Sequence, residues 1–144
     1  MNMPKPHRPQ PLARRDHRRG AAAVEFALVL PLFVALVFGT IEYGWFFYQN
    51  FNVASSVRDG LRVGVTVAQA ASPDPKATSV KKTQDLLTGV GINPASVTIN
   101  AIYNGSTPSK TLTLSATMPY KPIIGFVPAP STIGYSMTML LELQ

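Results

Sequence analysis

The stretch AAAVEFALVLPLFVALVFGTIEYGWFFY, residues 21–48, decides the fold because it is apolar almost throughout. Only Glu25, Thr40 and Glu42 interrupt it. About 20 helical residues are enough to cross a bilayer, so this run is long enough to span one. Its end is rich in Tyr, Trp and Phe, as is typical of a membrane–water boundary. The sequence therefore predicts a transmembrane helix, since a chain of 144 residues leaves little protein to bury such a helix in a soluble core.

The positive charge of the chain is concentrated before this helix. Six of the 13 Lys and Arg residues precede Ala21, against one acid, while seven basic and six acidic residues follow it. Residues 1–19 are also rich in proline and have no apolar periodicity, which predicts an unstructured basic arm. The positive-inside rule places this arm in the cytoplasm and the rest of the chain outside. A nucleic-acid-binding domain is not indicated, because its basic residues would lie on a folded face.

The usual catalytic side chains are scarce. The chain has no cysteine, and its two histidines, His7 and His17, lie in the basic arm. No nucleophile motif, paired carboxylates or glycine-rich phosphate loop is present. The sequence therefore predicts a protein that is not an enzyme and that has no cofactor and no metal site.

Beyond Tyr48 the apolar residues continue with the period of a helix. They are Ala54, Val57, Leu61, Val65 and Ala68, while Ser56 and other polar residues occupy other faces. No proline occurs between Pro31 and Pro73, so we expect one helix from about Ala21 to about Ala70, closed by Pro73 and Pro75. Gly60 and Gly64 have a spacing that would permit close helix packing.

The C-terminal half changes period. Residues 76–88 predict a short helix, and alternating apolar residues at 97–103 and 112–118 predict a β-hairpin. A last strand is expected from about Ile133 to Leu143, after a segment, residues 120–131, too apolar for an ordinary surface loop.

The predicted fold class is α+β, a long N-terminal helix packed on a small antiparallel sheet. The predicted division of the chain is a basic leader (1–20), a transmembrane helix (21–48), its continuation outside the membrane (49–72) and a small α+β domain (73–144).

The segment RRGAAAVEFALVLPLFVALVFGTIEYG, residues 18–44, resembles the N-terminus of type IV pilin-like proteins. More narrowly, it is similar to the TadE-like pseudopilins of the tight-adherence (Flp) pilus system. The matching features are a basic leader ending in Gly20, three alanines from Ala21, and Glu25–Phe26 before an apolar helix. Residues 38–64 also resemble the family's continuation of that helix. The resemblance implies a pilin-like arrangement of helix and sheet.

The resemblance also implies how the site residues act. A membrane-embedded prepilin peptidase would cut between Gly20 and Ala21, which makes Glu25 the fifth residue and Phe26 the sixth of the mature chain. Glu25 would then pair with the freed amino terminus of a neighbouring subunit, since a paired charge costs less to bury than a lone one. The alternative is that Glu25 snorkels toward lipid head groups beside Arg18 and Arg19. Glu42 is expected at the outer interface, with no assigned role.

The predicted function is that of a minor pseudopilin in assembly of a Tad-type pilus. It implies a single-pass protein of the bacterial inner membrane, with the C-terminal domain periplasmic or extracytoplasmic. Expected partners are the prepilin peptidase and other pseudopilins or pilus-assembly platform proteins, without nucleic acid. The alternative is a membrane-anchored extracytoplasmic protein of unrelated role with an uncleaved signal anchor. The sequence leaves open whether the protein enters the pilus or only assists its assembly.

Overall fold

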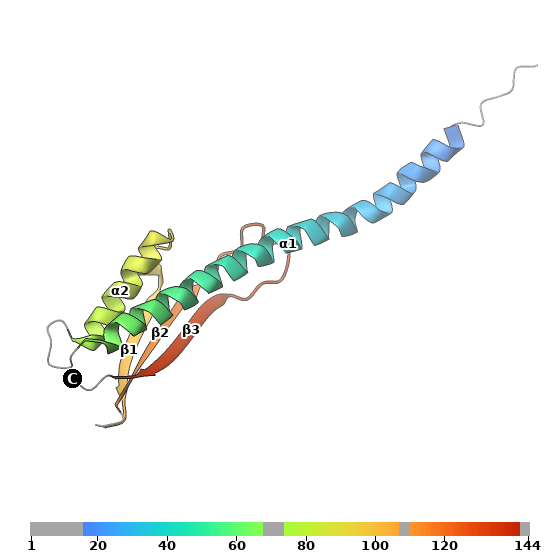
Figure 1. The fold of residues 1–144 in the computed structure, drawn as a ribbon. Helices are drawn as coiled ribbons and strands as arrows, with labels where there is room; N and C mark the ends of the chain where they lie inside the picture. Colours follow the sequence, from blue (N-terminus) through green and yellow to red (C-terminus); the bar gives the residue numbers. More distant parts are fainter. Residues whose placement is uncertain (1–15, 68–73, 107–109, 142–144) are drawn as a thin grey trace, which may run out of the picture. The chain divides into compact units, whose positions relative to one another are not determined.

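The computed structural model describes residues 16–67, 74–106 and 110–141. In chain order its elements are α1 (Asp16–Val65), α2 (Pro75–Gly89), the short 3-10 helix η1 (Pro94–Ser96), β1 (Thr98–Asn104), β2 (Thr111–Pro119) and β3 (Thr132–Leu140) (Figure 1). The α+β fold predicted from the sequence is confirmed. The chain divides into two compact units, residues 1–37 and 38–144, and the described part of the first unit consists of α1 alone.

Helix α1 is 50 residues long and contains Pro31. It begins at Asp16, five residues before the predicted start at Ala21, and no proline in residues 16–20 prevents this extension. It ends at Val65, before the predicted end at about Ala70. The amide of Val67 donates to the carbonyl of Gly64 at 3.2 Å, which turns the chain out of the helix. Ala68, Ala70 and Pro73 lie outside the described residues.

Helix α2 is defined by local signals at both ends. Asp74 caps its start by accepting a 2.7 Å hydrogen bond from the amide of Ala77, and Pro75 occupies the first turn, where its missing N–H costs nothing. The expectation that Pro75 closes the long helix was therefore wrong, because it opens the next one. Past the other end, Gly91 adopts φ 78°, a left-handed conformation that favours glycine.

The three strands form one antiparallel sheet in the order β1-β2-β3. Thr98 pairs with Thr117 in the first hairpin, and Thr111 pairs with Leu140 across β2 and β3. The predicted hairpin is confirmed. The last strand is shorter than expected and stops at Leu140, after which the amide of Leu141 donates to the carbonyl of Lys110 at 3.0 Å.

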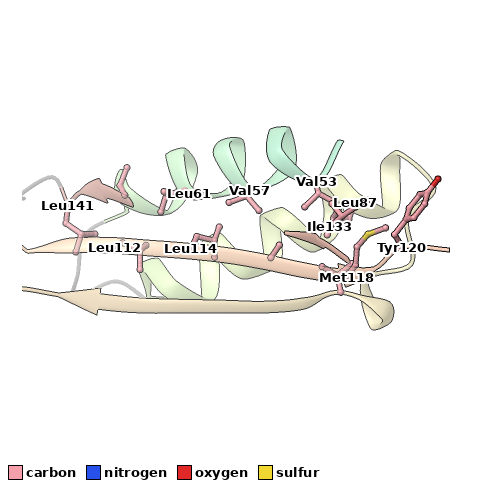
Figure 2. Packing of buried hydrophobic residues seen from close by; sticks show 13 residues of the cluster. Val53, Val57, Leu61, Leu87, Leu112, Leu114, Met118, Tyr120, Ile133 and Leu141 are labelled. Carbon is pink, nitrogen blue, oxygen red and sulfur yellow. The ribbon is translucent and has the colours of Figure 1, made fainter. Parts of the chain in front are cut away.

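The core lies between the sheet and the second half of α1. Figure 2 shows Val53, Val57 and Leu61 of α1 facing Leu112 and Leu114 of β2. The buried apolar residues are Val53, Val57, Leu61, Val65, Leu87, Val97, Leu112, Leu114, Ala116, Met118, Tyr120, Ile133 and Leu141. The predicted helix stripe was wrong in one respect: Val53, not the half-buried Ala54, heads it.

A second buried face of α1 packs against α2. Gly60 and Gly64 lie on it, together with Ser56, which is only 3% exposed. A Cβ atom added at Gly64 would lie 2.7 Å from the carbonyl oxygen of Pro75, and one at Gly60 would lie 2.9 Å from that of Ser79. The two glycines therefore allow α2 to approach the backbone of α1, as their spacing would permit.

Candidate functional site

The residues predicted to be processed lie together near the start of α1. Gly20, Ala21, Glu25 and Phe26 are all helical and exposed, and no atom would contact a Cβ added at Gly20. Ala21 and Glu25 are four residues apart, so their side chains lie one turn apart on the same helix face. The exposed carboxylate of Glu25 is therefore open to a group outside the chain, one helical turn from Ala21.

The helix around Glu25 is apolar and uncovered. One helix in the described chain, Gly20–Val65, is long and apolar enough to cross a membrane, and its most apolar window is not buried. Large apolar side chains including Phe26, Leu28 and Leu32 are more than half exposed. Such a surface is unusual for a monomer in water and is typical of a segment that contacts lipid or other helices.

Glu42 is the residue that sequence reasoning missed. Its side chain is fully buried, although it lies in the same apolar helix as the exposed Glu25. One carboxylate oxygen accepts the hydroxyl of Tyr120 at 2.5 Å and the amide of Ile123 at 3.2 Å. The other accepts the amides of Ile124 at 2.9 Å and Gly125 at 3.2 Å. Glu42 thus holds the loop between β2 and β3, residues 120–131, against α1.

The neighbours of Glu42 strengthen the attachment of the 120–131 loop. The hydroxyl of Tyr43 donates to the carbonyl of Pro128 at 2.8 Å. Phe46 contacts Tyr120 edge to face, with ring centroids 5.2 Å apart. Both partners of the contact between Glu42 and the 120–131 loop stand out in the sequence. Glu42 is an acid in an apolar helix, and the loop is too apolar for an ordinary surface loop. Nothing local in the sequence joins the two features, because Glu42 and Tyr120 are 78 residues apart.

Tyr120 is a buried phenol at the base of the loop, and its hydroxyl also reaches the carbonyl of Glu42 at 3.2 Å. Burial, with the hydrogen bond to the Glu42 carboxylate and its negative charge, raises the pKa of Tyr120 to about 12. The folded chain therefore keeps this proton at a pH where the unfolded chain, with an ordinary pKa of 10.0, loses it. The resulting stability is complete below pH 10 and is lost as the pH rises toward 12.

We expect the Tyr120→Phe variant to lose this alkaline transition. It lacks the phenol, so it should also lose roughly 1.5–3 kcal/mol of stability, the usual net worth of a hydrogen bond to a charged group. The measurement is an ultraviolet titration of tyrosinate in the full chain, with Tyr135→Phe as the control for removal of one phenol. Identical titration curves for both variants above pH 11 would contradict the assignment.

Within residues 16–67, 74–106 and 110–141, no group of three or more His, Cys, Asp or Glu side chains is placed to hold a metal ion. The hollow beside Gln49, Asn93 and Lys121 encloses about 210 Å³, and its lining contains no pair of groups suited to acid–base catalysis.

The comparison with known protein families gives a match that lies within α1. Residues 20–62 match the family model described as TadE-like protein, so the match covers most of α1 and none of the sheet. No curated protein and no solved structure matches the chain. The family match suggests involvement in the Tad pilus system, and the single apolar helix suggests single-pass membrane anchoring. The match confirms the resemblance predicted from the sequence, and it makes residues 20–62 of this chain a TadE-like segment.

Proposed function

We propose that the protein is a minor pseudopilin that acts in assembly of a Tad-type pilus and has no enzymatic activity of its own. The observation that carries this proposal is the exposed carboxylate of Glu25, one helical turn from Ala21 in a TadE-like apolar helix. An acidic residue costs about 2.5–3.5 kcal/mol at the centre of a spanning helix and less near its end, where Glu25 stands. A carboxylate placed there, with no partner among the described side chains of its own fold, serves best as a contact for a second chain.

Processing would create that contact. A prepilin peptidase that cuts between Gly20 and Ala21 leaves a positively charged amino group on Ala21. Gly20 lies inside α1, and glycine disfavours a helix by about 1 kcal/mol relative to alanine, so the helix is locally easier to open at the cut. Phe26 follows Glu25 and would form part of the segment recognised with the leader.

Assembly would then pair charges between subunits. The amino group of one mature chain and the Glu25 carboxylate of its neighbour attract strongly where water is excluded, and the pair costs less to bury than either charge alone. This pairing would set the register of one helix against the next. The partners are other pseudopilins or pilus-assembly platform proteins in the inner membrane, with the basic leader cytoplasmic and the sheet domain extracytoplasmic.

The substitution Glu25→Gln separates maturation from assembly. We expect cleavage after Gly20 to continue, because the leader glycine defines the cut, and piliation or co-purification with partner pseudopilins to fall severely. The amide keeps the size and hydrogen bonding of the side chain but lacks the charge that the amino group requires. An immunoblot for cleavage and a pilus count on the same strain measure the two effects.

Two results would reject the proposal. Normal pili with Glu25→Gln and with Glu25→Ala would show that the carboxylate only snorkels to head groups. A chain isolated from cells with Met1 intact would instead favour an anchored extracytoplasmic protein with an uncleaved signal anchor. The matched control is Asp59→Gln, which removes an exposed acid from the same helix beyond the apolar segment and should change neither cleavage nor piliation.

A further inference from the structure

The 120–131 loop presents apolar side chains to solvent at its tip. Ile123 is 58% exposed, Ile124 36% and Phe126 66%, although their backbone is fixed by Glu42. The remaining loop residues near the tip, including Lys121, are also exposed. Three large apolar side chains gathered on one short loop are unusual for a surface that meets only water.

The contacts of this loop place it at a defined level of α1. The ring of Phe126 meets that of Phe38 edge to face, with centroids 6.5 Å apart. Val127 lies over Gly39, within ordinary contact distance of a Cβ added there. The backbone amides at the tip of the loop also donate hydrogen bonds to the carboxylate of Glu42. The loop therefore covers α1 between Phe38 and Tyr43.

That level coincides with the expected edge of the bilayer. About 20 helical residues cross the hydrocarbon core, and 20 residues counted from Ala21 end at Thr40. The boundary thus falls within the turn of α1 that the loop covers. The exposed apolar side chains of the tip therefore lie at the level of α1 where head groups are expected to begin.

The backbone of the tip is suited to this environment. Irregular backbone is costly near lipid unless its N–H groups have partners. Pro122 has no N–H, and the amides of Ile123, Ile124 and Gly125 all donate to the Glu42 carboxylate. Four consecutive residues therefore present no free amide, while the side chains of Ile123 and Ile124 are exposed. Lys121, at the start of the tip, can reach lipid phosphates with its ammonium.

We infer that the tip of the 120–131 loop, residues 121–126, inserts into the outer face of the bilayer that α1 spans and forms a second membrane contact of the chain. Glu42 makes this insertion possible because its carboxylate accepts the hydrogen bonds of the amides of the tip. The spanning segment is then shorter than residues 21–48, and Glu42 and the aromatic residues after it lie at or above the head groups. This inference rests on membrane anchoring alone and not on a role in pilus assembly.

The absence of native cysteine allows a direct test with single labels. The full chain is reconstituted at low protein density in vesicles of phosphatidylethanolamine and phosphatidylglycerol. A fluorophore is attached at Ile123→Cys or, separately, at Phe126→Cys. Two matched controls are Ile102→Cys, which is 55% exposed on the outer face of β1, and Leu32→Cys, which is 72% exposed in the apolar segment. Quenching by aqueous iodide is compared with quenching by lipids that carry a nitroxide near the head group.

We expect the labels at 123 and 126 to be quenched several-fold more by the lipid nitroxide, and several-fold less by iodide, than the label at 102. If both loop labels behave like the label at 102 while the label at 32 reports lipid, the inference is wrong and anchoring stands. Shielding from iodide that disappears on dilution of the protein in lipid would assign the tip to a second copy of the chain. A label at 32 that reports water would reject membrane anchoring itself, and the inference with it.

Discussion

Replacement of Glu42 by glutamine is expected to detach the 120–131 loop from α1, although the two side chains have the same shape. The carboxylate accepts four hydrogen bonds, two at each oxygen. An amide replaces one of these oxygens by an NH₂ group, which would face either two backbone N–H groups or a hydroxyl and an N–H. The variant loses the charge that strengthens every bond at the site and places donor against donor. Hydrogen exchange at residues 123–125 should rise to the rate of an unprotected loop.

The matched control for this prediction is Glu25→Gln in the same helix, which removes an exposed carboxylate and should leave exchange in the loop unchanged. Glu42→Ala should release the loop as completely as Glu42→Gln, because it removes all four acceptor positions. Loop amides that remain protected in both Glu42 variants would mean that Tyr43 and the ring contacts hold the loop without the carboxylate.

Replacement of Gly64 by alanine is expected to force α2 away from α1. The new Cβ would lie 2.7 Å from the carbonyl oxygen of Pro75, closer than real Cβ contacts, and backbone at the start of α2 must move to relieve it. Overpacking costs about 1–3 kcal/mol, and more where backbone shifts, which outweighs about 1 kcal/mol of improved helix propensity. We expect a lower free energy of unfolding for this variant, and a larger loss for the double variant with Gly60→Ala.

Gly44→Ala is the control, since it lies in the same helix and no atom would contact its Cβ. That variant should be unchanged or slightly more stable, because it gains helix propensity without a clash. Unfolding by denaturant in detergent micelles gives the comparison. Equal stability of the Gly44 and Gly64 variants would contradict the close approach of the two helices.

The parts of the fold that depend on residues close together in the sequence could be predicted. The length and apolarity of residues 21–48 require a helix, and alternation at 97–103 and 112–118 requires strands, because side chains repeat every 3.6 residues in one and every two in the other. The same local information carries the TadE-like segment, since Gly20, Glu25 and Phe26 are close together in the chain. The expected processing and pairing at these residues stay predictions, because the partner of Glu25 belongs to another molecule.

The buried faces of α1 depend on tertiary contacts and could not be assigned fully from the sequence. Val53 replaces Ala54 at the head of the buried stripe because α1 has two buried faces, one on the sheet and one on α2. The sequence showed the spacing of Gly60 and Gly64, but only the docked α2 shows that the two glycines are required for close approach.

The role of Glu42 was decided by the tertiary structure alone. Its partner Tyr120 is 78 residues away and the amides of Ile124 and Gly125 are 82 and 83 residues away, so no local pattern links them. By itself the sequence determined that a carboxylate stands in an apolar helix, where it must find donors or face lipid. Only the path of the chain from β2 to β3 determines that Glu42 finds its donors within the fold, while the equally apolar surroundings of Glu25 leave that carboxylate exposed. The physical reason is that burial of a charge requires several donors converging on one point, and such convergence is a property of the folded backbone rather than of any single segment.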